Sequence, residues 1–267
     1  MEKQEIIREL RVISRKLNRS PGRREISYRL YHQCIKQFGS FNNAKIKTGL
    51  HIIKRKCDPI PKNCFILTKT LSGIVSYLLF DGHLYKNLRG FTLYSTDLTM
   101  LKAFEKAIKK QFKLKGKYRF NHAGSHNQTH LIEFFNVRVA QFLRRIGVPN
   151  GDKSIIPYRV PMWIKKNKEY SREFLKIAFS CEGSWKENDR SNPRIKFNMH
   201  KVEELRRNGV LFMMDLKSML KKFGIETTPI SFYNGKIRKD GYITKELRFR
   251  ILTKCNNKFI KQIGWYK

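Results

Sequence analysis

Acidic residues are scarce in this chain of 267 residues, which carries 57 Lys and Arg but only 21 Asp and Glu and so has a net charge of +36. Such an excess of one sign destabilises the compact state and attracts a polyanion, either nucleic acid or an anionic membrane surface. The hydrophobic fraction of 40% and the aromatic fraction of 12% are close to ordinary globular usage, which excludes a disordered basic tail. Nucleic acid is therefore the favoured partner.

Long apolar runs are also missing. No segment approaches the roughly 18 apolar residues that a membrane span requires, and the first residues, MEKQEIIREL, lack the apolar region of a secretory signal peptide. The sequence thus predicts an intracellular protein without a membrane partner, cytoplasmic and nucleoid-associated in a prokaryote or else in an organelle.

Cysteines are few, and the sequence contains no Cys-x-x-Cys pair. Because the five cysteines are also odd in number, neither a disulfide framework nor a structural zinc site is indicated. Cys181 lies directly before Glu182, but the sequence places no histidine beside it as a base. We therefore expect Cys181 to serve as a small packing residue rather than as a nucleophile.

The first 56 residues predict a small helical module that binds DNA. One apolar stripe at helical spacing ends before Ser20-Pro21-Gly22, a second helix is expected at residues 23–37, and a third, short helix follows Gly39-Ser40. The module holds 15 Lys or Arg against four Glu, as expected of a helix-turn-helix-like unit on a phosphate backbone, although a solvated basic face gives the same composition. Residues 57–64 are expected to form a linker.

The rest of the chain contains the same pattern twice. An apolar run ends in Asp81-Gly82, and a second ends in Glu182-Gly183. After each run come two strand-like segments, a basic amphipathic helix (residues 97–113 and 202–223), two further strand-like segments and a closing helix. The sequence therefore predicts an α+β protein with two αββαββα repeats, residues 65–147 and 170–267, joined by a connector at residues 148–169. Such a duplication favours a monomer with internal pseudo-twofold symmetry.

Asp81 and Glu182 are the candidate catalytic residues. A carboxylate at the C-terminal end of a helix opposes the helix dipole by about 0.3–1 kcal/mol, so two such ends side by side require a cation. Mg²⁺, which is commonly held by one or two carboxylates together with substrate phosphates, suits this place, and Mn²⁺ could replace it. Metal-assisted hydrolysis of phosphodiesters is the resulting hypothesis. The alternative for either acid alone is a solvent-exposed helix end.

Three strand-like segments alternate basic or amide residues with apolar ones. The apolar sets are Tyr118 and Phe120, then Ile195, Phe197 and Met199, then Leu247, Phe249 and Ile251. At a period of two, helices would cover one face of the sheet and DNA the other, although any half-solvated antiparallel sheet also alternates. The candidate DNA-binding residues are Lys117, Arg119, Asn121, Arg194, Lys196, Asn198, His200, Arg248 and Arg250.

These segments resemble those of a single-chain, two-repeat LAGLIDADG homing endonuclease. Residues 71–82 (LSGIVSYLLFDG) and 174–184 (FLKIAFSCEGS) look like its two signature helices, and GVPNGDK at residues 147–153 with VPMWI at residues 160–164 looks like its connector. The N-terminal segments NRSP, FGSFNNA and GL (residues 18–21, 38–44 and 49–50) are similar to the small homing-endonuclease-associated helical repeat.

The resemblance implies a saddle of two β-sheets on duplex DNA, with the signature helices packed at its centre and divalent metal bound by Asp81 and Glu182. It places Lys254, and less directly Lys201, where the family has a site lysine and a polar residue that organises water. The sequence departs from the family at Phe80 and Ile177, where Gly or Ala is frequent and close helix packing favours small side chains.

The function expected from the sequence is therefore that of a site-specific homing DNA endonuclease that cuts both strands of a long duplex. Two alternatives share the fold. One is a maturase that binds intron RNA, which the composition does not separate from a DNA-binding protein. The other is a catalytically silent regulator that binds DNA, which the residues at positions 80 and 177 keep open.

Overall fold

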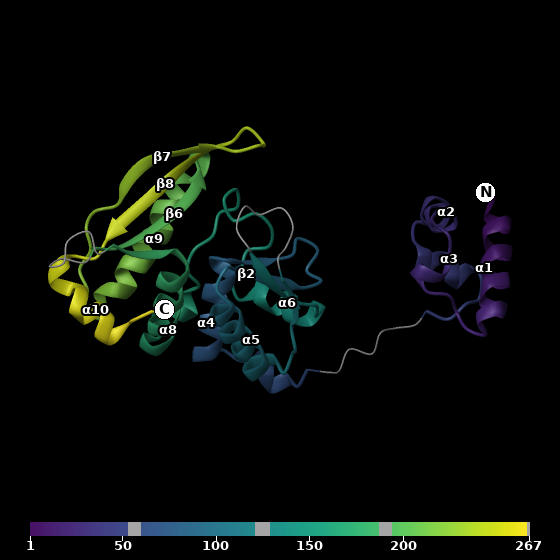
Figure 1. The fold of residues 1–267 in the computed structure, drawn as a ribbon, viewed down its shortest axis with the longest axis horizontal. Coiled ribbons are helices and arrows are strands. Elements are labelled where there is room, and N and C mark those ends of the chain that lie inside the picture. Colours follow the sequence, from purple (N-terminus) through teal and green to yellow (C-terminus); the bar gives the residue numbers. More distant parts are fainter. Residues whose placement is uncertain (53–59, 121–128, 187–193, 266–267) are drawn as a thin grey trace. The chain divides into compact units, whose positions relative to one another are not determined.

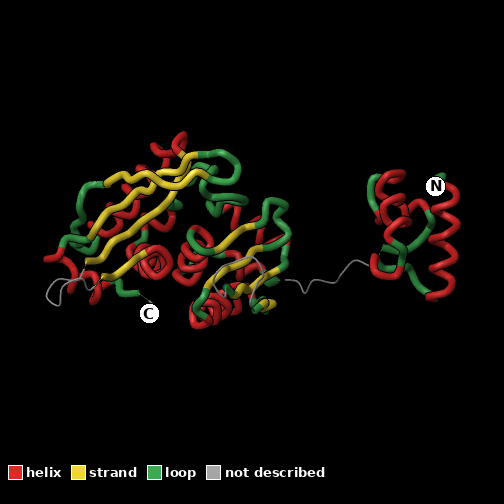
Figure 2. The backbone as a smooth tube through the Cα atoms, turned by 45° about the horizontal axis from the view of Figure 1, so that its top comes forward, coloured by secondary structure: helices red, strands yellow, loops and turns green. Residues whose placement is uncertain are grey.

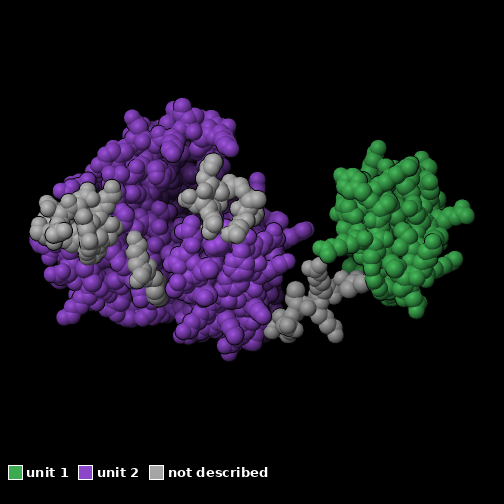
Figure 3. Space-filling model, viewed as in Figure 1, with its two compact units in different colours: residues 1–58 green, residues 59–267 purple. Residues whose placement is uncertain are grey.

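The computed structural model describes residues 1–52, 60–120, 129–186 and 194–265. The chain divides into two compact units, residues 1–58 and residues 59–267, which Figure 3 shows in different colours. Within the described ranges, none of the helices is long and apolar enough to cross a membrane.

The first unit is a three-helix module around a small core. Its helices are α1 (Lys3–Leu17), α2 (Tyr28–Phe38) and α3 (Phe41–Lys47), and Ile6, Leu10, Leu30, Cys34 and Ala44 are buried between them (Figure 1). Gly39 ends α2 with a φ of 75°, and the Ser40 hydroxyl accepts the Asn43 N–H at 3.0 Å to start α3.

The expected start of the second helix at residue 23 is wrong. Residues 23–25 form a separate 3₁₀ turn, in which the Glu25 carboxylate accepts the Gly22 N–H at 2.6 Å. The helix begins only at Tyr28, because Ser27 is extended and its hydroxyl accepts the Leu30 N–H at 3.1 Å.

The second unit contains the αββαββα pattern twice, as the sequence predicts. The first repeat consists of α4 (Lys69–Leu79), β1 (Gly82–Leu84), β2 (Phe91–Ser95), α5 (Leu98–Phe112), β3 (Lys117–Arg119), β4 (His130–Phe134) and α6 (Val137–Arg145). The second consists of α8 (Lys168–Glu182), β5 (Gly183–Lys186), β6 (Arg194–Val202), α9 (Arg206–Lys221), β7 (Ser231–Ile237), β8 (Ile243–Arg250) and α10 (Asn256–Gln262). The connector between them contains α7 (Met162–Lys166).

Each repeat builds one antiparallel sheet of four strands, and the strand order is equivalent in the two. The first sheet has the order β1-β2-β4-β3, and the second has the order β5-β6-β8-β7. The two sheets lie on either side of the pair of helices α4 and α8 in Figure 1. The α+β fold with two equivalent repeats is therefore confirmed.

The alternation predicted for the second sheet is confirmed. Ile195, Phe197, Leu247 and Phe249 are all buried, and α9 packs on β6 and β8 on this side. On the other side, cross-strand neighbours bring the polar residues together in the pairs Lys196 with Arg250, Asn198 with Arg248 and His200 with Glu246.

The corresponding expectation for Phe120 in the first sheet is wrong. Strand β3 ends at Arg119, and Phe120 is 60% exposed, with its ring stacked on that of Tyr118 at 5.8 Å. Phe120 therefore leaves the alternating pattern because the strand stops one residue before it. Asn121 lies outside the described residues.

Helices α4 and α8 pack side by side between the two sheets (Figure 2). The Ser76 hydroxyl on α4 donates a hydrogen bond to the Phe174 carbonyl on α8 at 2.8 Å. A Cβ atom on Gly73 would lie only 2.7 Å from Ile177 Cδ1, so the absence of a side chain at Gly73 makes room for Ile177.

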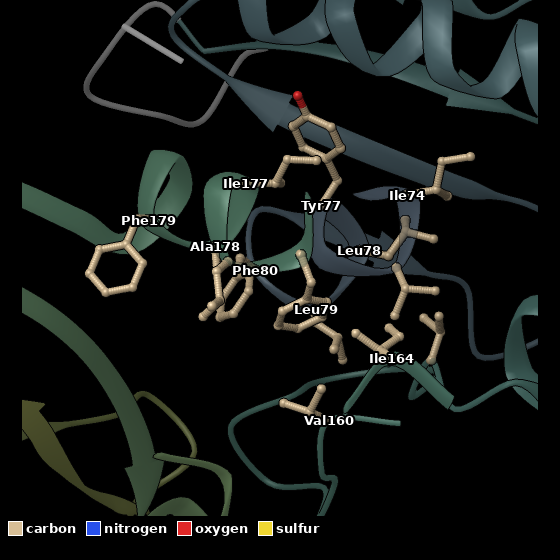
Figure 4. Close-up of a cluster of buried hydrophobic side chains, with 14 of the residues drawn as sticks. Ile74, Tyr77, Leu78, Leu79, Phe80, Val160, Ile164, Ile177, Ala178 and Phe179 are labelled. Carbon is tan, nitrogen blue, oxygen red and sulfur yellow. The ribbon is translucent and has the colours of Figure 1, made fainter. Parts of the chain in front are cut away.

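The large side chain of Phe80 is also accommodated, in this case by the aromatic rings around it. Its ring packs edge-on against those of Phe174, Phe197 and Phe212, with centroid distances of 6.0, 5.6 and 6.0 Å. Figure 4 shows Phe80 beside Ala178, whose small side chain lies on the facing helix. The two departures from small residues are thus accommodated in the helix contact rather than preventing it.

We expect Ile177→Ala to lower the free energy of unfolding by about 2–5 kcal/mol, because it leaves a cavity against Gly73 in a closely packed helix pair. Urea unfolding followed by circular dichroism measures this. The control Ile260→Ala alters a residue that is 46% exposed on α10 and should change the value by no more than about 0.5 kcal/mol. Equal effects of the two substitutions would contradict the packing described.

Candidate active site

Two carboxylates meet where α4 and α8 end. Asp81 follows Phe80, the C-cap of α4, and Glu182 is the last residue of α8. The thiol of Cys181 donates a hydrogen bond to the Asp81 carboxylate across the helix pair. The packing of α4 on α8 therefore brings together two acids that are 101 positions apart in the sequence.

The glycine after each acid is required by close approach of the backbone. A Cβ atom on Gly82 would lie 2.8 Å from Leu78 Cα, and one on Gly183 would lie 2.3 Å from the Phe179 carbonyl oxygen. In both repeats the chain turns tightly against its own helix directly after the acid. The Asp-Gly and Glu-Gly pairs in the sequence thus fix where each carboxylate leaves its helix.

Both carboxyl groups have raised pKa values because they are partly withdrawn from water. Burial and the neighbouring charge of Asp81 raise the pKa of Glu182 to about 7, while the Lys153 ammonium opposes the shift. Burial also raises the pKa of Asp81, against the Cys181 hydrogen bond and the charge of Lys153. The two acids therefore repel each other in a poorly solvated site, which is the arrangement that a cation would stabilise.

Sequence reasoning missed Lys153, which lies in the connector. Its ammonium donates hydrogen bonds to the carbonyls of Leu78, at 3.3 Å, and Phe80 at the C-terminal end of α4, and to that of Gly82, at 2.7 Å, where β1 begins. The sequence does require a cation at this helix end, but nothing in its periodicity shows which residue reaches there. The Lys of GVPNGDK was the only available signal.

The two candidate lysines occupy different environments. Lys201 is fully buried on the apolar side of β6 and donates to the carbonyls of Ile156, at 2.7 Å, and of Lys153. Burial lowers the pKa of Lys201 to about 7. Lys254 is 65% exposed and forms an ion pair with Glu226 at 2.9 Å. The structure thus joins Lys201 to the site through the backbone of Lys153, whereas Lys254 lies on the surface.

The donor set at the helix ends fits a hard divalent ion that shares its ligands with a substrate. Among the described residues there is no group of three or more His, Cys, Asp or Glu side chains that could enclose a metal by itself. Mg²⁺ commonly binds one or two carboxylates and completes its shell with water and phosphate oxygens, which is what Asp81 and Glu182 could offer. The Cys181 thiol donates its hydrogen bond to Asp81, and a hard ion such as Mg²⁺ prefers oxygen ligands to sulfur.

The candidate DNA-binding residues that the structure describes lie on the sheets. Lys117, Arg119, Arg194 and His200 are exposed, and Lys196, Asn198, Arg248 and Arg250 are half-buried.

Acidic side chains that the sequence analysis did not single out orient two of these arginines. The Arg119 guanidinium pairs with Glu133 at 2.7 Å, and that of Arg248 pairs with Glu246 at 2.6 Å and donates to Asn198 at 3.1 Å. The ring of Tyr233 lies 4.3 Å from the Arg248 guanidinium. Contacts of this kind hold a guanidinium in one orientation on the sheet.

The family described as homing endonuclease associated repeat matches residues 1–51, nearly the whole first unit. The chain is 32% identical over 185 residues to a tRNA-splicing ligase RtcB of Methanopyrus kandleri, covering 64% of this chain and 18% of that protein. It is 29% identical over 196 residues to the DNA-directed RNA polymerase subunit Rpo1N of Methanocaldococcus jannaschii, covering 66% and 14%. The chain thus spans less than a fifth of either relative, and their two unlike activities give no reason to transfer either.

Several solved structures follow a similar course of the chain. Mesophilic variants of the homing endonuclease I-DmoI match at 13% identity, with a TM-score of 0.45, over 73% of this chain and 90% of theirs. The homing endonuclease I-WcaI bound to its DNA recognition sequence matches at 14% identity with a TM-score of 0.46, over 80% of this chain and 93% of that one. The N-terminal LAGLIDADG domain of DUF199/WhiA matches at 14% identity with a TM-score of 0.46, over 78% of this chain and 87% of that one. These likenesses are distant, and the fold is defined by the repeated αββαββα topology itself.

We expect the charge of Glu182 to destabilise the metal-free protein as the pH rises. Because its pKa is about 7 in the folded state and near 4.5 in the unfolded state, the folded state binds more protons between these values, and stability falls as the pH rises through that window. In thermal unfolding in EDTA from about pH 5 to about pH 8, the melting temperature of Glu182→Gln should therefore rise relative to that of the wild type as the pH rises. A difference in melting temperature between the two proteins that stays the same at every pH would contradict the burial of this carboxylate.

Proposed function

We propose that this chain, a two-repeat LAGLIDADG protein with an N-terminal homing endonuclease associated repeat, is a site-specific DNA endonuclease that depends on Mg²⁺ or Mn²⁺ and cuts both strands of a long duplex. The observation that carries the proposal is the meeting of Asp81 and Glu182 at equivalent ends of two packed helices, where burial and mutual repulsion favour a bound cation. Two equivalent half-sites match a substrate with two strands.

The polar faces of the two sheets are the proposed DNA-binding surface. In the second sheet Lys196, Asn198, Arg248 and Arg250 form a continuous patch across neighbouring strands, on the face opposite to the buried aromatic residues. Arg and Asn side chains can read guanine and adenine edges in the major groove, whereas the outlying Lys and Arg residues would contact phosphates. The N-terminal module would add further phosphate contacts through its basic helices.

The side chains at the centre have separate tasks in this proposal. Asp81 and Glu182 would hold the divalent ion. When bound, the ion lowers the pKa of an attacking water and stabilises the charge that develops on phosphorus and on the leaving oxygen. Lys254, whose ammonium is exposed, would neutralise charge on the DNA backbone, and the buried Lys201 would act through the connector that it holds.

The two alternatives remain outcomes of experiment. A maturase would bind folded intron RNA more tightly than any duplex, and loss of the two acids would not affect its binding. A silent regulator would select a duplex and leave it intact in every divalent ion. The proposed enzyme acts as a monomer, because one chain already holds both half-sites.

A cleavage selection on randomised duplex DNA tests the proposal. Duplexes bound in Ca²⁺ are captured, Mg²⁺ is then added, and the ends are sequenced. We expect staggered ends at one recurring sequence with the wild type, and retained binding with loss of cutting in at least one strand for Asp81→Asn, because the amide cannot supply the charge that the ion requires. Full double-strand cutting by Asp81→Asn, or by Asp81→Asn with Glu182→Gln, would remove the acids from the mechanism.

Substitutions on the two sides of the second sheet test the binding surface. Arg194 lies exposed at the start of β6, and Lys221 lies exposed on α9, which covers the opposite face. We expect Arg194→Gln to weaken duplex binding and to lower the slope of log affinity against log salt by about one, the value for a single phosphate contact. Lys221→Gln removes the same charge and should leave this slope nearly unchanged. Similar slopes for the two variants, in titrations followed by fluorescence anisotropy, would contradict the assignment of this face.

A further inference from the structure

We propose that Lys153 is the resident cation of the catalytic centre, a positioning residue whose ammonium holds the end of α4 in place and compensates Asp81 and Glu182 whenever no divalent ion is bound. The inference rests on the proposed function for the role of the two acids. It concerns the folded protein before metal and DNA arrive, so it can be tested separately from cleavage.

The hydrogen bonds of Lys153 surround the backbone of Asp81. The carbonyls of Phe80 and Gly82 flank this residue on either side, and that of Leu78 lies on the last turn of α4. The C-terminal carbonyls of a helix have no partner within the helix and carry the negative end of its dipole. One ammonium therefore pairs with the helix-end carbonyls of Leu78 and Phe80, and through its bonds to Phe80 and Gly82 it fixes the peptide groups on both sides of Asp81.

The connector delivers Lys153 to this position because both repeats hold it. On the side of the first sheet, the Gly151 N–H donates to the Leu84 carbonyl at 3.0 Å. On the side of the second sheet, the Val202 N–H donates to the Ser154 carbonyl at 3.2 Å, and Arg238 forms an ion pair with Asp152 at 2.6 Å. Lys201 holds the carbonyl of Lys153 itself. The residues on both sides of Lys153 are thus anchored.

The charges around Lys153 are mostly acidic. Burial lowers the pKa of the Lys153 ammonium to about 8, and the fields of Asp81 and Glu182 are the strongest of those that oppose this shift, ahead of that of Asp152. The ammonium bonds the carbonyls on both sides of Asp81, and its field acts on both carboxylates, so it compensates their repulsion, which a bound divalent ion would otherwise relieve. The Lys153 ammonium and a bound metal ion would thus both compensate the negative charges of Asp81 and Glu182.

Thermal unfolding without DNA tests the proposal, with the full chain in EDTA and in Ca²⁺. We expect Lys153→Met to lower the melting temperature in EDTA, and Ca²⁺ to raise it more in Lys153→Met than in the wild type. Combining Lys153→Met with Asp81→Asn and Glu182→Gln should restore part of the loss in EDTA, because without the acids there is no repulsion to compensate. The matched control is Lys217→Met, which removes a half-buried lysine that donates to a single carbonyl, that of Thr228, at 2.8 Å. Any decrease in the melting temperature of Lys217→Met should be the same with and without Ca²⁺, and with and without the two acids.

A loss in Lys153→Met that is unchanged by Ca²⁺ and by removal of the acids would overturn the proposal, because Lys153 would then only satisfy carbonyls. If Lys153→Met does not fold in EDTA, recovery of a cooperative transition in the triple variant supports the proposal, and continued failure to fold overturns it. Since no step of this experiment involves DNA, a protein that binds metal without cutting DNA would still give the expected pattern. The proposed endonuclease and the proposed role of Lys153 can therefore fail independently.

Discussion

The close contact of α4 with α8 is the constraint on which the remaining structure depends. Gly73 and Ala178 let the two helices approach, and the Ser76 hydrogen bond to the Phe174 carbonyl joins them where the side chains are small. Once the helices lie side by side, their acidic ends must share one poorly solvated place. The fold thus forces Asp81 and Glu182 to repel each other at its centre. The Lys153 ammonium of the connector and the proposed metal ion both reduce this repulsion.

Local patterns predicted most of the fold because they depend on one element at a time. The alternation in β6 and β8 follows from a sheet with one covered face, and the acid-glycine pairs follow from a chain that turns tightly at a helix end. The errors arose where a short-range hydrogen bond set a boundary, as with Ser27 before α2, or where a strand stopped early, as at Phe120.

The candidate site was predictable only in part, for a related reason. Asp81 and Glu182 repeat at equivalent places, so the sequence reveals them. Lys153 has no counterpart in a periodic pattern, and its role exists only because two sheets anchor the connector at distant points. Lys201 could be recognised as a polar residue at a strand end, but its burial on the apolar face depends on the connector that it contacts. Tertiary contacts of irregular segments are what sequence periodicity cannot encode.

The connector also removes the equivalence of the two halves. The topology of the second unit is nearly twofold, yet a single segment joins the end of one repeat to the start of the next, and its Lys153 donates to the carbonyls of Leu78 and Phe80 at the end of α4. In the described part of the chain, the hydrogen bonds of Lys153 go to the end of α4 and to Gly82 and not to α8, so exchanging the repeats would not reproduce the same centre. A symmetric dimer of one repeat would have no connector at all and would need a cation from elsewhere to keep its acids together. Joining the repeats in one chain therefore gives this protein an internal charge that a dimer of separate repeats would lack.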